Sequence, residues 1–131
     1  MKSLLLLFAL LLGTTSVSAQ HTHQHRIVMQ LTSGDTLVHK MMMKQLRNMK
    51  EAAPTIQVEV VCHGPGMEML MNDRSIVQEK IKELASKGIV FLACENTIRE
   101  RNLDRTKVLA EAGYVQAGII HIVERQEGGC T

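Results

Sequence analysis

The sequence lacks tryptophan and has only one tyrosine and two phenylalanines among its 131 residues. Recognition of nucleic-acid bases by stacking on aromatic side chains is therefore nearly excluded. Proline is also scarce, with two residues, and no repeat or low-complexity block divides the chain. A core built from this sequence must depend on valine, isoleucine, leucine and the nine methionines.

Neither positive nor negative charge dominates, since the chain has 15 lysines and arginines and 13 acidic residues. This near balance argues against nucleic acid or an anionic membrane as the main partner. The sequence also lacks a hydrophobic run long enough to span a bilayer, which needs about 20 residues. Three cysteines are too few for a disulfide scaffold, and their odd number leaves at least one unpaired within the chain.

The N-terminus has the pattern of a secretory signal peptide. Lys2 precedes an apolar run at residues 4–12, and small side chains follow at residues 17–19. We therefore expect residues 1–19 to be removed before Gln20, and the protein to be secreted or periplasmic with no stable membrane insertion. A retained N-terminal anchor is the alternative.

Residues 20–131 have the size of a single domain, in which strand and helix signals alternate. Short β-prone apolar segments occur at 25–32, 56–62 and 89–93, and we expect a last strand within residues 114–123, centred on 118–123. Helical spacing or helix-capping signals lie between them. These predicted helices cover residues 36–53, 73–87 and 95–101. The alternation predicts an α/β domain with a mainly parallel sheet of about four or five strands and helices on both faces.

In such folds ligands and reacting groups gather at the carboxyl ends of the strands. Cys94 follows the most hydrophobic predicted strand and precedes Glu95, Asn96 and Thr97, at the expected start of a helix. Free backbone N–H groups there would stabilise a thiolate and could bind a ligand. The alternative is an inert, buried cysteine that packs as a small hydrophobic residue.

The predicted strand at 56–62 ends in Cys62, and a Gly- and Pro-rich loop follows. Cys62 could form a disulfide with Cys94 if their strands are neighbours, and the strand order remains open at this point. His63 could protonate a sulfur leaving group, or its side chain could form only a hydrogen bond with the backbone of the loop. Gly64 and Gly66 would shape a loop whose amides bind a small anion, and Ser33 follows the first strand at the same edge.

The sequence contains two groups of residues that could bind a metal ion. Cys62, His63, Cys94 and Glu95 could form a zinc set, but no Cys-x-x-Cys pair supports one, so we predict neither metal nor cofactor. The histidines of residues 20–25 could bind copper, nickel or zinc, but a solvated flexible tail is the more ordinary interpretation.

Three segments together resemble the DsrE/DsrF-like family: Cys62-His63-Gly64-Pro65-Gly66, residues 91–97 ending in Ala-Cys-Glu-Asn-Thr, and residues 115–126. The resemblance implies a three-layer α/β/α sandwich, a homo-oligomer (trimer or hexamer), and a cysteine that carries persulfide sulfur. By this resemblance Cys94 would hold sulfur received from a small donor or a sulfur-relay protein. A non-catalytic oligomeric module that binds a small anion or ligand is the alternative function.

The chain departs from that family in two ways. The family usually continues with Glu-Gly-Trp-x-Tyr after Arg125 and Gln126, whereas this chain has Gly129 and Cys130. The expected export also excludes transfer-RNA thiolation in the cytoplasm, which is the task of some members. Whether the protein turns over as a sulfurtransferase or only relays sulfur is therefore left open.

Overall fold

The computed structural model describes residues 24–131, so the expected signal peptide and most of the histidine-rich tail lie outside the described residues. Gln24 and His25 are tied to the sheet, because the Gln24 side chain donates to the Thr55 carbonyl and Gln57 N–H donates to the His25 carbonyl. Within the tail expected at 20–25, these two residues are therefore held by hydrogen bonds. In the described part, no helix is both long and apolar enough to cross a bilayer.

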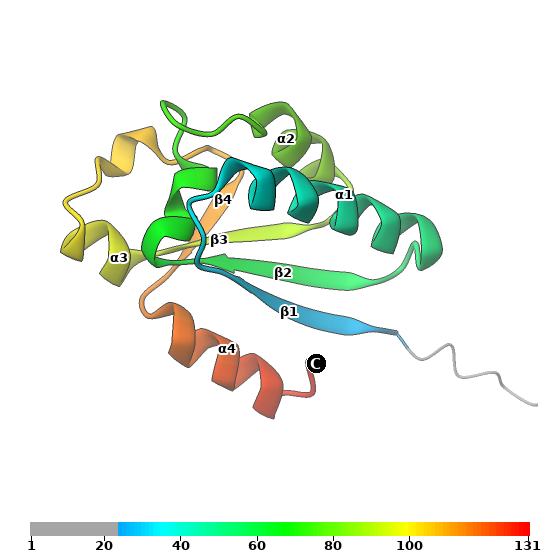
Figure 1. Cartoon of the computed structure of the whole chain (residues 1–131). Helices are drawn as coiled ribbons and strands as arrows, with labels where there is room; N and C mark the ends of the chain where they lie inside the picture. The colour runs from blue at the N-terminus through cyan, green and yellow to red at the C-terminus, as the bar shows by residue number, and fades with distance from the viewer. Residues whose placement is uncertain (1–23) are drawn as a thin grey trace, which may run out of the picture.

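Strands and helices alternate along the chain as the sequence predicts (Figure 1). The strands are β1 (Arg26–Leu31), β2 (Gln57–Cys62), β3 (Val90–Cys94) and β4 (Ala112–Val115). The α-helices are α1 (Thr36–Ala52), α2 (Gln78–Ser86), α3 (Glu95–Glu100) and α4 (Gly118–Glu127), and the 3-10 helices are η1 (Gly64–Leu70) and η2 (Arg105–Lys107). This order confirms the predicted α/β fold.

The four described strands form one parallel sheet in the order β1-β2-β3-β4. Each strand therefore lies beside the next one in sequence, and all carboxyl ends meet at one edge. β2 and β3 occupy the centre, which explains why valine, leucine and phenylalanine fill them. Their register aligns Cys62 with Ala93, one residue before Cys94.

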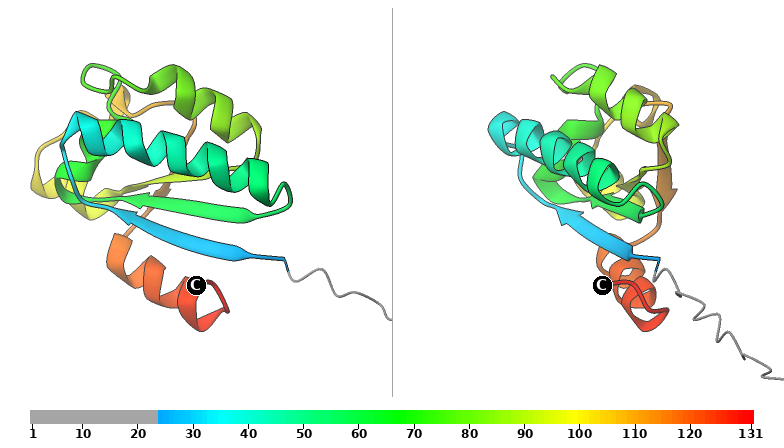
Figure 2. Two further views of the ribbon diagram at one scale, coloured as in Figure 1. Left: turned by 45° about the vertical axis from the view of Figure 1, so that its right-hand side comes forward. Right: turned by 90° about the vertical axis from the view of Figure 1, so that its right-hand side faces the viewer.

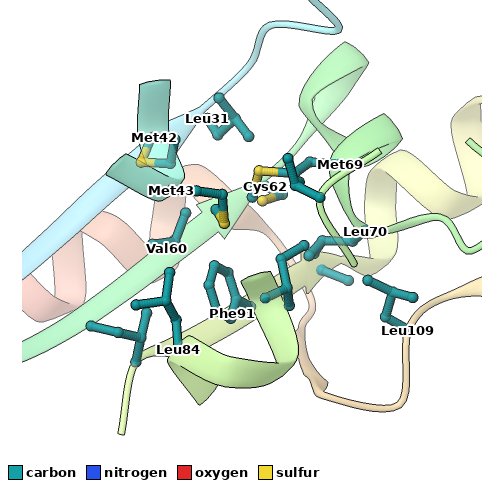
Figure 3. Packing of buried hydrophobic residues seen from close by; sticks show 14 of the residues in the cluster. Leu31, Met42, Met43, Val60, Cys62, Met69, Leu70, Leu84, Phe91 and Leu109 are labelled. Atoms are coloured by element: carbon teal, nitrogen blue, oxygen red, sulfur yellow. The ribbon is translucent and has the colours of Figure 1, made fainter. Parts of the chain in front are cut away.

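Helices cover both faces of the sheet (Figure 2). α1, α2 and η1 lie on one face, and α4 lies alone on the other (Figure 1). The larger core is between the sheet and the first layer, where methionines and Phe91 pack around Cys62 (Figure 3). Within it Leu46, Val60, Met67 and Phe91 are at most 1% exposed.

The strand expected at 118–123 is wrong, because these residues begin α4 and the last strand is Ala112–Val115. A short apolar run does not distinguish a strand from one face of a helix. Here Ile119, Ile120 and Val123 are exposed on α4. The helix expected at 73–87 also starts later, at Gln78, because turns and bends occupy the residues before it.

Candidate functional site

Cys94 is the last residue of β3 and the N-cap of α3, at the carboxyl edge of the sheet. Its side chain is 4% exposed. The strand-to-helix junction predicted from the sequence is therefore present, and it holds the cysteine just beneath the surface. α3 is short, with only six residues. The backbone N–H group that hydrogen-bonds the Cys94 sulfur belongs to another segment.

The Cys94 sulfur contacts the turn between β4 and α4. Gly118 N–H donates a hydrogen bond to Sγ at 3.3 Å, and Sγ lies 4.0 Å from the Gln116 carbonyl oxygen. Gly118 is the first residue of α4, a helix of ten residues. An N–H group at a helix N-terminus carries partial positive charge and favours an anionic acceptor. No local sequence signal indicates this contact, because the apolar pattern predicts a strand at these residues.

Cys62 lies on the opposite face of the sheet from Cys94. It aligns with Ala93, and successive side chains of a strand point to opposite faces. Cys62 packs with Met42, Met43 and other core residues and is fully buried (Figure 3). Burial in this apolar surrounding raises the pKa of the Cys62 thiol well above its ordinary value.

A disulfide between Cys62 and Cys94 is therefore ruled out by geometry, although β2 and β3 are neighbours. All three cysteines are free. The sequence could place both residues at the ends of adjacent strands, but the one-residue offset in register directs their side chains to different layers. Cys62 is a packing residue of the core here, and Cys94 has no resolving thiol beside it.

His63 lies on the same side as Cys94 and shares a neighbour with it. A Cβ on Gly118 would meet His63 Cδ2 at 3.3 Å and a Val61 methyl at 3.2 Å, so the imidazole packs directly against Gly118. The Nε2 atom of His63 is buried and has no hydrogen-bond partner in the described structure. Because a buried polar atom without a partner costs free energy, this nitrogen is available to a group that enters the site.

The loop after β2 is held to β1 and α3 by backbone contacts. A Cβ on Gly66 would lie 2.0 Å from the Leu31 carbonyl oxygen, so only glycine fits there. Gly64 adopts a φ of 54° and donates its N–H to Thr97 Oγ1 at 2.9 Å. Gly64, Gly66 and Thr97 therefore hold the loop in place, and the Gly64 amide is already satisfied within the protein.

The other predicted ligand-binding residues also have partners. The Glu95 carboxylate accepts a hydrogen bond from Arg105, whose guanidinium lies 3.8 Å from the centre of the Tyr114 ring. Asn96 N–H donates to the Gln116 carbonyl, which fixes the turn that faces the Cys94 sulfur. Ser33 Oγ accepts from Asp35 N–H at the start of α1. Of these residues, Asn96 is the one tied to the turn around the sulfur.

A carboxylate that the sequence did not single out anchors α4 to the sheet. Glu59 of β2 accepts from His121 Nε2 at 2.7 Å and from Arg125 Nε at 2.9 Å. Burial raises the pKa of Glu59, but the hydrogen bonds and charges of His121 and Arg125 outweigh it and hold that pKa below the usual range. The end of the chain adds a second anchor, since the Thr131 backbone pairs with Arg26 and Val28 of β1.

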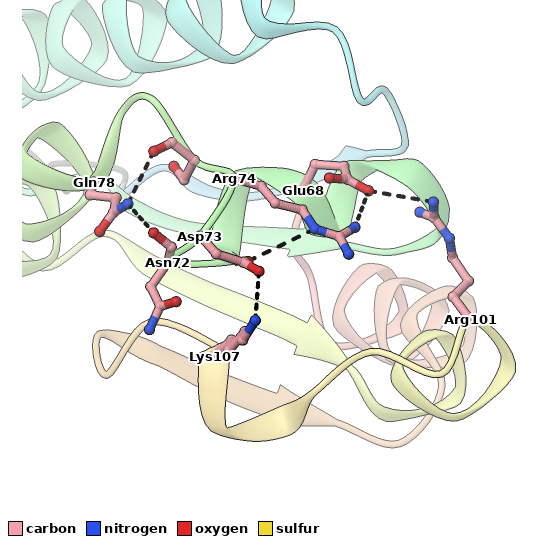
Figure 4. A network of polar contacts seen from close by, with 8 residues as sticks. Glu68, Asn72, Asp73, Arg74, Gln78, Arg101 and Lys107 are labelled. Carbon is pink, nitrogen blue, oxygen red and sulfur yellow. Dashed lines mark hydrogen bonds and ion pairs between the residues drawn. The ribbon is translucent and has the colours of Figure 1, made fainter.

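Two features border this site. A hollow of about 460 Å³ lies along the β4–α4 turn and the first turns of α4, lined by Val115, Gln116, Ala117, Ile120, His121 and Glu124. On the other side of η1, a surface network joins Glu68 to Arg74 and Arg101, and Asp73 to Lys107 (Figure 4). The arginines of this network are paired with carboxylates and are not directed at the Cys94 sulfur.

Within residues 24–131, no three histidine, cysteine, aspartate or glutamate side chains lie close enough together to hold a metal ion. Cys62 and Cys94 lie on opposite faces of the sheet, so the zinc set weighed from the sequence does not assemble.

No family model and no curated protein matches the chain. Among solved structures, it is similar to MTH1491 from Methanobacterium thermoautotrophicum, a protein of unknown function, at 29% identity and a TM-score of 0.78, over 82% of this chain and 96% of that one. It is also similar in fold to BT1422 from Bacteroides thetaiotaomicron, a conserved protein of unknown function, at 19% identity and a TM-score of 0.66, over 81% of this chain and 90% of that one. These likenesses support the α/β fold, and neither name states an activity.

Proposed function

We propose that the protein is an exported, DsrE-like sulfur carrier in which Cys94 holds one sulfur atom as a persulfide. The partner would be a small sulfur donor or a sulfur-relay protein, and the working form would be a homo-oligomer. The single observation that carries this proposal is the hydrogen bond from Gly118 N–H to the Cys94 sulfur. An amide N–H at a helix N-terminus interacts favourably with negative charge on the sulfur that it contacts.

The proposed step is a displacement at sulfur. The Cys94 thiolate attacks the outer sulfur of thiosulfate and forms a new S–S bond, while the old S–S bond breaks and sulfite leaves with its electron pair. The product is a persulfide anion on Cys94, so charge and atoms balance without an added oxidant. With an organic hydropersulfide as donor, a thiolate leaves instead, and the outer sulfur keeps its proton.

Two groups at the site would assist this step. The Gly118 amide would stabilise the thiolate before attack and the persulfide after it. The unpartnered Nε2 of His63, packed against Gly118, would donate a hydrogen bond to the incoming sulfur or to the leaving group. Cys62 has no part in the chemistry, since it lies in the core on the other face.

Access to the sulfur requires movement, because Cys94 is 4% exposed. The β4–α4 turn contacts the sulfur, and the hollow described above lies along that turn. We therefore propose that Gln116 and Ala117 of this turn move outward to admit the donor, while Gly118 N–H keeps its hydrogen bond to the sulfur. The Glu59 contacts further along α4 would hold the helix to the sheet.

The test is mass spectrometry of the protein after exposure to thiosulfate or polysulfide, with peptide mapping of the added sulfur. Sulfide alone is the negative control, because it cannot add sulfur to a free thiol without an oxidant. We expect one additional sulfur atom on Cys94 and none on Cys62. Cys94→Ser should lose the modification, whereas Cys130→Ser, which also removes one free thiol, should keep it.

A second function has one observation in its favour. The low exposure of Cys94, together with the hollow beside it, suits a module that binds a small anion or ligand at the strand ends without sulfur chemistry. Unmodified Cys94 with both thiosulfate and polysulfide, in a protein whose Cys94 still reacts with a small alkylating reagent, would contradict the carrier and favour this module.

A further inference from the structure

A basic groove runs along the outer helical layer, on the opposite side of the sheet from Cys94. α1 and α2 lie side by side there (Figures 1 and 2). Two hollows of about 220 and 400 Å³ follow the junction and share Arg47 and Leu84, so they form one continuous groove. Its charged lining residues are Lys40, Lys44, Arg47, Lys50, Lys80, Lys87, Glu51 and Glu83.

The charge of this groove is unlike that of the whole chain. It contains six of the 15 lysines and arginines but only two of the 13 acids. Both acids are paired within the groove, Glu83 with Lys87 at 2.6 Å and Glu51 with Arg47 at 3.7 Å. The rest of the sequence therefore has more acidic than basic residues, so positive charge is concentrated in the groove although the net charge of the chain is close to zero.

Several of these lysines make no close polar contact that would stabilise the fold. Lys40 and Lys44 form no hydrogen bond or ion pair with another described residue, Lys80 acts on Glu83 through its charge alone, and all three are exposed. Lys50, by contrast, donates to the carbonyls of Pro54 and Ile56. Like charges set side by side repel one another, so three lysines with no close carboxylate contact along one groove are more favourable when an anionic partner is present.

We propose that this groove binds an acidic peptide segment of another protein. From Lys40 to Lys50, α1 rises about 15 Å, which equals about five residues of extended chain. The floor is closed by Met43 and Leu84, which are 2% and 3% exposed, so a partner lies along the groove and not deep within it. Leu37 and Met41, exposed one turn from Lys40 and Lys44, offer apolar contacts to the same segment.

The shape of the groove favours a peptide over the other polyanions. A bilayer is flat at this scale and cannot follow a recess between two helices, and the scarcity of aromatic residues removes the base-stacking contacts that single-stranded nucleic acid uses. The proposal is independent of sulfur chemistry at Cys94, because the sheet separates the two sites.

The probe is a fluorescein-labelled hexaglutamate peptide, measured by fluorescence anisotropy with the full folded protein, and hexaglutamine is the neutral control peptide. The groove variant is Lys44→Gln with Lys80→Gln. Its matched control is Lys82→Gln with Arg99→Gln, which removes the same charge from exposed sites that do not line the groove. Thermal unfolding of both variants verifies that the fold is kept.

We expect hexaglutamate to bind, binding to weaken as salt is added, and the groove variant to bind about three- to tenfold more weakly, while the control changes less than about twofold. Equal losses in the two variants, or equal binding of hexaglutamine, would overturn the proposal. Binding of phosphatidylserine vesicles that the groove variant loses, without any binding of hexaglutamate, would overturn it as well and assign the groove to membranes.

Discussion

The interaction of Glu59 with His121 and Arg125 yields the sharpest prediction about stability. Glu59→Gln preserves the shape of the side chain but removes the charge that both partners contact. The carboxylate is 20% exposed and lies between β2 and α4. Because α4 is the one described helix on its face of the sheet, the loss should fall mainly on the attachment of α4 (Figure 1).

The size of the effect follows from the bonds that are lost. A hydrogen bond to a charged group contributes about 1.5–3 kcal/mol, but glutamine can still accept one bond and the site is partly solvated. We expect the free energy of unfolding to fall by about 1–2 kcal/mol near neutral pH. For a domain of this size, that corresponds to about 4–8 °C in Tm for each kcal/mol.

The pH dependence of the stability difference between wild type and Glu59→Gln is an independent check on the role of the Glu59 charge. The pKa of Glu59 in the folded protein is held below the ordinary glutamate value of 4.5. Its contribution to stability is therefore fully present above pH 4.5 and is lost as the pH falls through the folded value. The difference between wild type and Glu59→Gln should shrink over that acidic range.

The assay is urea or thermal unfolding of wild type, Glu59→Gln and the matched variant Glu83→Gln, at neutral and acidic pH. Glu83 also pairs with a cation, Lys87, but at an exposed site on α2, so its replacement should cost clearly less. Equal losses for the two variants, or a Glu59→Gln difference that does not shrink on acidification, would refute this reasoning. Faster alkylation of Cys94 in Glu59→Gln would in addition indicate that α4 controls access to the sulfur.

Three further predictions can be tested with single variants or the unmodified protein. Gly66→Ala should cost more than about 3 kcal/mol or prevent folding, because its Cβ would lie 2.0 Å from the Leu31 carbonyl oxygen, and expression with circular dichroism would show it. Cys62 should resist alkylation until the protein unfolds, since burial raises its pKa, whereas Cys130 should react in the folded state; labelling of Cys62 as fast as Cys130 would contradict this. If the protein is a homo-oligomer that buries the exposed apolar side of α4, Ile120→Glu should shift it to monomer in analytical ultracentrifugation, and an unchanged mass would place the interface elsewhere.

The sequence was sufficient to predict the fold class because the central strands are largely apolar and because two helix ends carry ordinary signals, the start of α1 and the end of α2. Asp35 caps α1 by accepting from Leu37 N–H, and Gly88, with a φ of 89°, follows the end of α2. The prediction is wrong at 118–123, where the apolar run suggested a strand. There the tertiary structure decides, since α4 exposes three of its four large apolar side chains, Ile119, Ile120 and Val123, to solvent.

The candidate site was predictable in its position but not in its contacts. Cys94, His63 and the glycine loop do lie at the carboxyl edge of the sheet, as strand-end residues of a parallel fold must. The amide that faces the sulfur belongs to Gly118, 24 residues further along the chain, and no local sequence pattern indicates this contact. Glu59 was missed for a related reason, because its partners lie on a helix that had not been predicted.

The different chemistry of two cysteines at the ends of neighbouring strands comes from a register offset of one residue. Cys62 aligns with Ala93, so it points into the methionine-rich core, where no donor contacts it and burial keeps it protonated. Cys94, one position further along, points to the other face, where α4 places an N–H group 3.3 Å from its sulfur. A shift of β2 by one residue would turn Cys62 to the same face as Cys94 and would leave Cys94 in place. The separation of the two thiols therefore depends on how β2 and β3 pair, and hydrogen exchange at β2 and β3 is a direct probe of that pairing.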